Sequence, residues 1–568
     1  MKKLKIYSYI IALLVTGVSC EQELVDNSAS PCPSDDPTII CPQQEVDQCA
    51  GASAGSANFG KFIAIGNSFV AGVQGGALFT AGQNNSLPAI LNKQFECVGA
   101  PANFVQPSIN ATLGWNLFIT QPKLTDPTKP ALGRMLLQYG TNIDCATGAA
   151  SPRPTPQAYA PSNVEAVPNP AVNPGFIYTG GKATLNNFGV PAVVLGQSLI
   201  PQTGAWAGAN SDPRFNPFYG RLAYPGTGSS TIIGDAAAAQ GTFFLFWLGL
   251  DDFFLYAAFG GDPARAPLTP ASGGLPNGFD GQYAAAIGSL MASNANLKGV
   301  VGNFPNIFAM PHFTSVTYNP IPLDATTAAA VSTGFAGYNA ALDGLIANAA
   351  AFGINDALKA EIATRKVSFS AGCNNKILII DETLTDLGPY FDGLKNAGAI
   401  NDAQRTALVP YQRVRQTTPT DIIPLSAGTV LGTTVGGNAT MVNGVTVPLA
   451  DQYVLIPSEI AQIETARAAY NAVVANTVAA FSTRLALADV NAALTSFVTA
   501  RAAVANNITV TPNINPPTGI YSEDGAHPNS RGYAFIANVF IDAINAKFGA
   551  SVPKVNLAKY SATALPIQ

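Results

Sequence analysis

The sequence predicts an α/β protein built around a mainly parallel β-sheet that helices cover on both faces. Short apolar runs with strand character recur along the 568-residue chain, and longer segments with helical periodicity lie between them. Strands that alternate with helices are typical of parallel sheets, because each helix returns the chain to the end of the sheet where the next strand starts. The last helical segment supports this interpretation, since its apolar residues fall on one face.

Five apolar runs are predicted as strands, at 62–65, 243–248, 300–301, 376–380 and, more weakly, 485–490. Four segments with helical periodicity lie at 283–293, 326–351, 458–481 and 532–548. In the last of them one face carries Tyr533, Ile536, Ala537, Phe540 and Ile544, and Gly549 stands where a helix C-cap belongs.

Residues 241–260 form the most apolar internal stretch and resemble a membrane span. Asp251 and Asp252 interrupt its middle, and placing carboxylates in lipid would be costly. We therefore expect a buried strand followed by a helix.

Two regions are predicted as insertions. Residues 150–175 contain seven prolines, which predicts an irregular loop. Residues 385–452 contain a helix-like piece and then a Gly- and Thr-rich stretch at 429–438, which predicts a hairpin or an edge loop. No internal repeat is evident.

The N-terminus resembles a bacterial lipoprotein signal. Lys2 and Lys3 precede an apolar run over 6–18, which is too short to span a bilayer stably, and small residues lead to Cys20. In that interpretation residues 1–19 are removed, Cys20 carries the lipid, and 20–58 form a Cys- and Pro-rich tether. The alternative is an ordinary cleaved signal peptide. We expect a cell-envelope protein anchored through Cys20, at the outer membrane and facing the periplasm or the exterior.

Six cysteines remain besides Cys20: Cys32, Cys41, Cys49, Cys97, Cys145 and Cys373. An even number in an exported chain favours disulfides, with fifteen possible pairings. Zinc binding is the alternative, but no His lies near the cluster at 32–49 and no Cys-x-x-Cys spacing occurs. We expect no metal and no cofactor.

Charged residues make up 11% of the chain, well below the usual figure of about 25%. The net charge is −5, with no basic stripe, so a nucleic-acid partner is not expected. The oligomeric state is left open by the sequence.

Only two histidines occur, and His527 follows Asp524 at a three-residue spacing just before the last helix. A serine hydrolase needs a base, usually His, that a carboxylate orients. Near the other end, the strand at 62–65 breaks at Gly66 and the following turn presents Ser68. Together these features predict an esterase.

Four short motifs carry a family resemblance: Gly66-Asn67-Ser68, the segment 187–192, Gly249-Leu250-Asp251-Asp252, and Asp524 with His527. In this order they resemble the four blocks of the GDSL, or SGNH, hydrolases, particularly the large lipoprotein members of Bacteroidetes-like bacteria. The resemblance covers the chain from about Lys61 to the C-terminus, and 522–537 is its most specific part. It implies that residues 59–568 form one hydrolase domain with a three-layer, flavodoxin-like core and long insertions.

The resemblance also implies the residue roles. Ser68 would be the nucleophile, His527 the base and Asp524 the residue that orients the imidazole. The oxyanion hole would consist of the backbone N–H groups of Ser68 and Ala192 and the side chain at position 251. The substrate would be a carboxylic ester, from a lipid or an acylated carbohydrate.

The chain departs from the family at position 251, where an Asn donor is usual and Asp251 stands. An ionised carboxylate there would repel the oxyanion. Three hypotheses follow: Asp251 stays protonated and donates; Asn67 and Asp251 have exchanged partners, as a reciprocal swap of the family's Asp and Asn; or catalysis is lost and the protein binds glycan or lipid through the cleft. A passive surface adhesin is a further class, against which the Asp524–His527 motif argues.

Other residues receive structural interpretations. His312 matches none of the four blocks and is expected to be a structural histidine near a strand end. Asp252 is expected to cap the following helix or to hold the loop. The pair Gly75-Gly76 lacks the context of a phosphate-binding loop.

Overall fold

The computed structural model describes residues 49–117, 132–143, 150–158, 176–209, 211–224 and 228–563. The chain divides into two compact units, Met1–Ala50 and Gly51–Gln568. The second unit contains the sheet and all the sites described below. The signal, Cys20 and most of the tether lie outside the described residues.

A five-stranded parallel sheet forms the centre of the second unit, in the order β15-β8-β7-β1-β6. In chain order its strands are β1 (Phe62–Gly66), β6 (Asn187–Gly189), β7 (Phe243–Trp247), β8 (Lys298–Gly302) and β15 (Leu485–Ala488). Counted along the chain, the spatial order is 2-1-3-4-5. The strand β1 lies between β6 and β7, with Gly66 opposite both Gly189 and Trp247.

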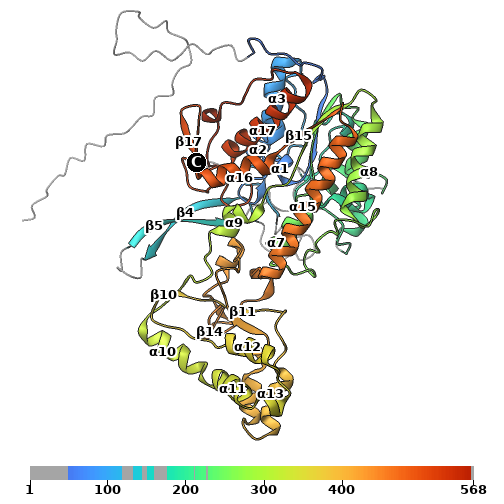
Figure 1. Ribbon diagram of the computed structural model, residues 1–568. Helices are drawn as coiled ribbons and strands as arrows, with labels where there is room; N and C mark the ends of the chain where they lie inside the picture. Colours follow the sequence, from blue (N-terminus) through green and yellow to red (C-terminus); the bar gives the residue numbers. More distant parts are fainter. Residues whose placement is uncertain are drawn as a thin grey trace, which may run out of the picture. The chain divides into compact units, whose positions relative to one another are not determined.

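Helices from distant parts of the chain pack on this sheet (Figure 1). The C-terminal helix α17 (Ser530–Phe548) contacts β15, β8 and α3 (Leu87–Phe95). The long helix α15 (Pro457–Ala480) also contacts β15 and β8, and it packs against α8 (Phe279–Ser293) and α7 (Asp251–Ala258). Buried apolar side chains join these elements into one core, which fixes the carboxyl ends of the strands relative to one another.

Shorter elements complete the described part of this core. They are α1 (Ser68–Ala71), β2 (Ala77–Leu78), α2 (Thr80–Asn84), β3 (Trp115–Asn116), α5 (Pro217–Ala223), α6 (Ile232–Ala238), α9 (Pro311–Thr314), α16 (Val490–Ala500), β16 (Ala503–Ala505) and β17 (Ile508–Val510).

A second hydrophobic core is built from residues between Ile321 and Ile456. Its elements are β9 (Ile321–Leu323), α10 (Ala325–Gly334), α11 (Ala336–Ala347), α12 (Asp356–Thr364), β10 (Gly372–Asn375), β11 (Leu378–Ile380), α13 (Gly388–Asn396), α14 (Asp402–Ala407), β12 (Val414–Gln416), β13 (Thr434–Val435) and β14 (Asn438–Val442). The predicted insertion at 385–452 lies within this core, which starts earlier in the chain, between β8 and α15.

The predicted strand at 376–380 exists as β11, but it is not part of the central sheet. It pairs antiparallel with β12 in a two-stranded sheet of the second core. Apolar composition predicted a buried strand and could not say which core buries it, because both cores offer apolar surroundings. The stretch at 429–438 takes part in the predicted hairpin, formed by β13 and β14.

The prediction of an irregular loop at 150–175 is wrong for residues 150–158. They form β5 (Ala150–Ala158), which pairs antiparallel with β4 (Met135–Ile143). The three prolines in β5 occupy alternate positions, 152, 154 and 156. In an antiparallel pair only alternate residues donate to the partner strand, so prolines with period two need not remove ladder hydrogen bonds. Residues 159–175 lie outside the described residues.

The apolar stretch at 241–260 is strand β7 followed by helix α7, as expected. Within the described ranges no helix is both long and apolar enough to cross a membrane. Cys49, Cys97 and Cys373 are each disulfide-bonded, in agreement with the prediction of disulfides. Cys32, Cys41 and Cys145 lie outside the described residues.

Candidate active site

The structure brings Ser68, Asp524 and His527 together at the carboxyl end of β1, although 459 residues separate Ser68 from His527. The oxygen Oγ of Ser68 lies 2.8 Å from Nε2 of His527. The other ring nitrogen of His527, Nδ1, lies 2.7 Å from Oδ2 of Asp524. A carboxylate only accepts, so Nδ1 carries the proton and Nε2 offers its lone pair to the Ser68 hydroxyl.

Ser68 begins helix α1 because the chain turns sharply where β1 ends. A Cβ at Gly66 would lie 2.3 Å from Cγ2 of Val70 and 2.6 Å from the carbonyl oxygen of Trp247, so only Gly fits there. Asn67 then caps the helix, with its Oδ1 accepting from the N–H of Phe69 at 3.1 Å. Ser68 is only 2% exposed, and Phe69 packs on the His527 ring at 5.0 Å between centroids.

Asp524 is held as an anion by several donors. Its Oδ2 accepts from the N–H of Gly76 at 2.6 Å, and its Oδ1 accepts from the N–H groups of Ala526 and His527, both at 2.9 Å. Burial alone would raise the pKa of Asp524. The nearby His527 and these N–H groups outweigh burial and lower the pKa to about 2. The carboxylate beside His527 is therefore charged at every ordinary pH.

The loop that carries Asp524 docks on the turn at Gly75 and Gly76. The N–H of Gly75 donates to Oγ of Ser522 at 2.9 Å, next to the Gly76–Asp524 contact. Ser522 also closes the loop, since its N–H donates to the carbonyl of His527 at 2.8 Å. The sequence held no signal that Gly75 and Gly76 bind a segment more than 400 positions away.

The predicted oxyanion donors Ser68 and Ala192 follow β1 and β6, neighbouring strands of the sheet. Ala192 has a φ of 53°, the left-handed conformation that favours Gly. The Nδ2 of Asn216 holds this turn by donating to the carbonyls of Pro191 at 2.8 Å and Ala192 at 3.4 Å. The N–H groups of Ser68 and Ala192 have no acceptor among the residues that the structure describes.

Asp251 lies in the site and contacts Asn67, the other exchanged residue. The Nδ2 of Asn67 donates to Oδ1 of Asp251 at 2.9 Å. Oδ2 of Asp251 is buried and has no hydrogen-bond partner within the described part of the chain. Burial raises the pKa of Asp251 to about 7, against the opposing effects of His527, Asn67 and the N–H of Val193. A carboxyl with this pKa is protonated below neutral pH and can then donate through Oδ2.

Asp252 holds the loop that follows Ala192, in agreement with one of its two expected roles. Its Oδ2 accepts from the N–H of Leu195 at 2.8 Å, and its Oδ1 accepts from Oγ1 of Thr269 at 2.8 Å. Burial raises the pKa of Asp252 to about 7, although these two hydrogen bonds oppose the shift.

His312 does not lie apart from the site. It is part of the short helix α9, and its Nδ1 lies 3.0 Å from the backbone carbonyl oxygen of Asp524. Sequence reasoning missed this contact, because no motif relates residue 312 to residue 524.

Three carboxylates in another part of the unit could hold a cation. One oxygen each from Glu382, Asp451 and Glu459 lie within 4.8 Å of one another. Burial, together with the neighbouring carboxylates, raises the pKa of Asp451 to about 7 and that of Glu459 to about 8. The four site residues Ser68, Asp251, Asp524 and His527 do not belong to this group.

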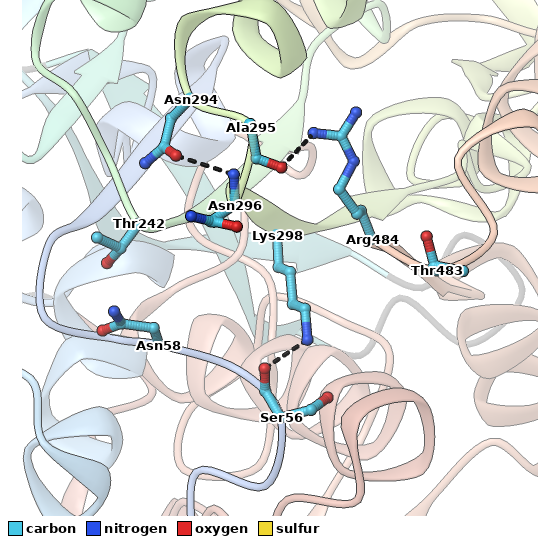
Figure 2. Close-up of a pocket in the computed structure, with 9 residues that line it drawn as sticks. All are labelled: Ser56, Asn58, Thr242, Asn294, Ala295, Asn296, Lys298, Thr483 and Arg484. Atoms are coloured by element: carbon cyan, nitrogen blue, oxygen red, sulfur yellow. Dashed lines mark hydrogen bonds between the residues drawn. The ribbon is translucent and has the colours of Figure 1, made fainter.

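A cavity of about 450 Å³ lies at the amino ends of the central strands, whereas Ser68 follows the carboxyl end of β1. Figure 2 shows the residues that line this cavity. Its lining includes Thr242, Lys298 and Arg484, which stand at or just before the amino ends of β7, β8 and β15. The charged groups are occupied, since Lys298 donates to the carbonyl of Ser56 and Arg484 to that of Ala295. The cavity shares no residue with the Ser68 site, so it does not define the substrate pocket of that site.

The Ser68 site thus contains a hydroxyl in contact with an imidazole, a charged carboxylate on the other side of that imidazole, two backbone N–H groups and a neutralisable carboxyl. Comparisons of the chain with protein-family models, curated proteins and solved structures find no match.

Proposed function

We propose that this protein is a serine ester hydrolase that forms an acyl-enzyme on Ser68. The observation that carries the proposal is the contact chain Ser68 Oγ–His527 Nε2–Asp524 Oδ2, with distances of 2.8 and 2.7 Å. Nucleophile, base and orienting group in this arrangement define the serine hydrolase triad by geometry, whatever the fold.

In the proposed mechanism His527 takes the Ser68 proton as Oγ attacks the ester carbonyl carbon. The tetrahedral intermediate collapses, the C–O bond to the alcohol breaks, and His527 returns the proton to the leaving alkoxide. Water, deprotonated by His527, then attacks the acyl carbon. The bond from that carbon to Oγ of Ser68 breaks, His527 returns the proton to Oγ, and the acid is released. Asp524 remains ionised throughout and stabilises the imidazolium, a role that suits its pKa of about 2.

The developing oxyanion would be stabilised by the N–H groups of Ser68 and Ala192 and by protonated Asp251. Asn67 occupies Oδ1 of Asp251, which leaves the unpartnered Oδ2 to carry the proton. Carboxylic acids that an apolar site keeps neutral act as such donors in other enzymes. Of the three hypotheses this proposal follows the first, in which Asp251 stays protonated and donates, and Asn67 holds the other oxygen of that carboxyl.

The fold assignment belongs to the same proposal. The sheet order 2-1-3-4-5 is that of flavodoxin-like doubly wound sheets, in which sites form at the carboxyl ends of the strands. We propose a three-layer SGNH-type core, with residues 59–568 as one hydrolase domain. The supporting features are this order, the position of Ser68 after β1, and the succession of the four motifs along the chain.

The proposed substrates are esters of lipids or acylated carbohydrates at the cell envelope, where Cys20 would anchor the protein. Ser68, at 2% exposure, favours a slender acyl group over a bulky one at the reacting carbon. The other candidate function is binding of glycan or lipid without turnover. Asp251 favours it, because an ionised carboxylate at the oxyanion would oppose catalysis.

The deciding experiment is hydrolysis of p-nitrophenyl acetate and butyrate by the soluble mature domain from pH 4 to 9, with Ser68→Ala as the control. Turnover that Ser68→Ala abolishes would support the hydrolase. Rates equal to the Ser68→Ala background at every pH would contradict it for simple esters and favour the binding protein.

A further inference from the structure

Both histidines of the chain bind the same residue. His527 uses Nδ1 to reach the Asp524 carboxylate at 2.7 Å, and His312 uses Nδ1 to reach the Asp524 backbone carbonyl at 3.0 Å. Since a carbonyl oxygen only accepts, Nδ1 of His312 must carry a proton. The Asp524 carbonyl has no other donor among the described residues.

His312 also fixes the next residue of the loop. Its backbone N–H donates to the carbonyl of Gly525 at 2.9 Å. The approach is close, because a Cβ at Gly525 would lie 2.7 Å from the His312 nitrogen, and Gly525 has a φ of 72°. A side chain at position 525 would push α9 and the loop apart, so two hydrogen bonds and a steric fit join His312 to residues 524 and 525.

The His312 ring is held in a fixed, neutral state. Burial lowers its pKa, and the ring packs against Phe254 at 6.0 Å and Phe313 at 4.9 Å between centroids. Its Nε2 is buried without a hydrogen-bond partner in the described part of the chain. A neutral ring with Nδ1 protonated satisfies the Asp524 carbonyl and leaves a lone pair, which is less costly to bury than a charge.

The helix that carries His312 is itself supported by the second core. It contacts the 3₁₀ turn Leu425–Thr429, and Val316, just after the helix, forms an antiparallel bridge with Ile423. The Asp524 loop is therefore bound by two separate segments. The Gly75–Gly76 turn binds its side chains, and α9 binds its backbone.

We propose that His312 is a positioning residue for the acid of the triad, which holds Asp524 so that its carboxylate meets Nδ1 of His527. The inference rests on the proposed hydrolase function for its kinetic consequence, but the structural relation can be tested without turnover. Removing the donor would free the 524–525 backbone to shift, and displacements of about 1 Å at a catalytic group can cost about a hundredfold in rate.

The test compares His312→Asn, His312→Gln and His312→Leu with the wild-type mature domain. The Asn amide can place an N–H where Nδ1 of His312 lies, the longer Gln amide cannot, and Leu has no donor. We expect kcat to fall about tenfold to a hundredfold in His312→Leu and His312→Gln, with KM within about threefold of the wild-type value. His312→Asn should keep most of the wild-type kcat. If His312→Leu fails to fold, the comparison of His312→Asn with His312→Gln still tests whether a donor at the position of Nδ1 is required.

A second measurement, NMR of the labelled histidine, does not depend on enzyme activity. With two histidines in the chain, each His312 variant retains one imidazole, so ¹⁵N-histidine labelling reports His527 alone. We expect the downfield signal of the Nδ1 proton of His527 to shift or broaden in His312→Gln and His312→Leu. In His312→Asn the signal should lie at its wild-type position. Equal kcat values for His312→Asn and His312→Gln would overturn the positioning role. An unchanged His527 signal in His312→Gln and His312→Leu would overturn it as well. A wild-type protein without Ser68-dependent turnover would refute the hydrolase instead and leave this measurement valid.

Discussion

Replacing Asp251 by Asn should change how activity depends on pH, because Asp251 has a protonated and an ionised state and Asn has neither. The Asn amide would keep an acceptor for Nδ2 of Asn67 and supply an N–H donor at every pH, where Asp251 donates only when protonated. The side chains are nearly the same size, so the buried site should accept the change without repacking. The variant therefore tests the charge at position 251 and little else.

The expected ratio of kcat/KM between the variant and the wild type follows from the pKa of Asp251, which is about 7. At pH 6 about nine-tenths of Asp251 is protonated, and the variant and the wild type should have similar kcat/KM. At pH 8.5 only about 3% is protonated, so the variant should exceed the wild type about 30-fold, which corresponds to about 2 kcal/mol of transition-state stabilisation.

The assay is kcat/KM for p-nitrophenyl acetate from pH 5 to 9, expressed as the ratio of variant to wild type. The double variant Asn67→Asp with Asp251→Asn restores the residue order of the family and is the matched control, expected to follow the single variant. A ratio that stays constant with pH would refute the protonated-donor reasoning. A single variant as inactive as Ser68→Ala would show that the carboxyl itself is required.

Other parts of the site give separate outcomes. Asp524→Asn fills the same space without the anion, and kcat should fall about ten-thousandfold with KM little changed; a loss below tenfold would contradict its role. Ala192→Gly keeps the backbone donor and relieves a φ of 53°, so kcat should stay within about threefold and Tm should not fall; a large loss would mean that the Ala192 methyl serves the site. Tm should decrease from pH 5 to 9, because the raised pKa values of Asp251, Asp252, Asp451 and Glu459 contribute stability that is complete below about pH 4 and is lost as pH rises through about 7 to 8. Glu459→Gln should flatten that dependence, and an unchanged slope would argue against the Glu459 contribution.

Much of the central sheet was predictable, since β1, β7, β8 and β15 are short apolar runs bounded by turns and helices. The fifth strand, β6, was recognised only as part of a motif, because Asn187 and Gly189 lack strand character. Gly189 is required there by packing, since a Cβ would lie 2.4 Å from the backbone nitrogen of Ala71. Such a close approach between distant segments has no local signature.

Ser68, Asp524 and His527 were predicted as a triad from motif order, and the structure places Ser68 and Asp524 each within hydrogen-bond distance of His527. The distant partners of Asp524 were not predictable. One of its donors is the N–H of Gly76, and its backbone carbonyl contacts His312, at separations of 448 and 212 residues. The extent of the second core was missed for a related reason. Its apolar residues have the same periodicities as those of the first core, and periodicity does not say which surfaces meet.

Three buried aspartates of this site fall into two groups by pKa, because His527 and the hydrogen-bond donors outweigh burial only at Asp524. Asp524, Asp251 and Asp252 are all buried, so desolvation acts on each in the same direction. Asp524 accepts from three backbone N–H groups and the His527 ring, and its pKa falls to about 2. Asp251 accepts from Asn67 at one oxygen, its other oxygen has no hydrogen-bond partner in the part of the chain that the structure describes, and its pKa is about 7. These surroundings divide identical side chains into a permanent anion, Asp524, and a neutralisable acid, Asp251, and these are the states that the proposed roles behind the base and at the oxyanion require. The exchange of Asp and Asn between positions 67 and 251 is then compatible with catalysis at and below neutral pH. It should lower kcat/KM only above the pKa of Asp251, which is about 7.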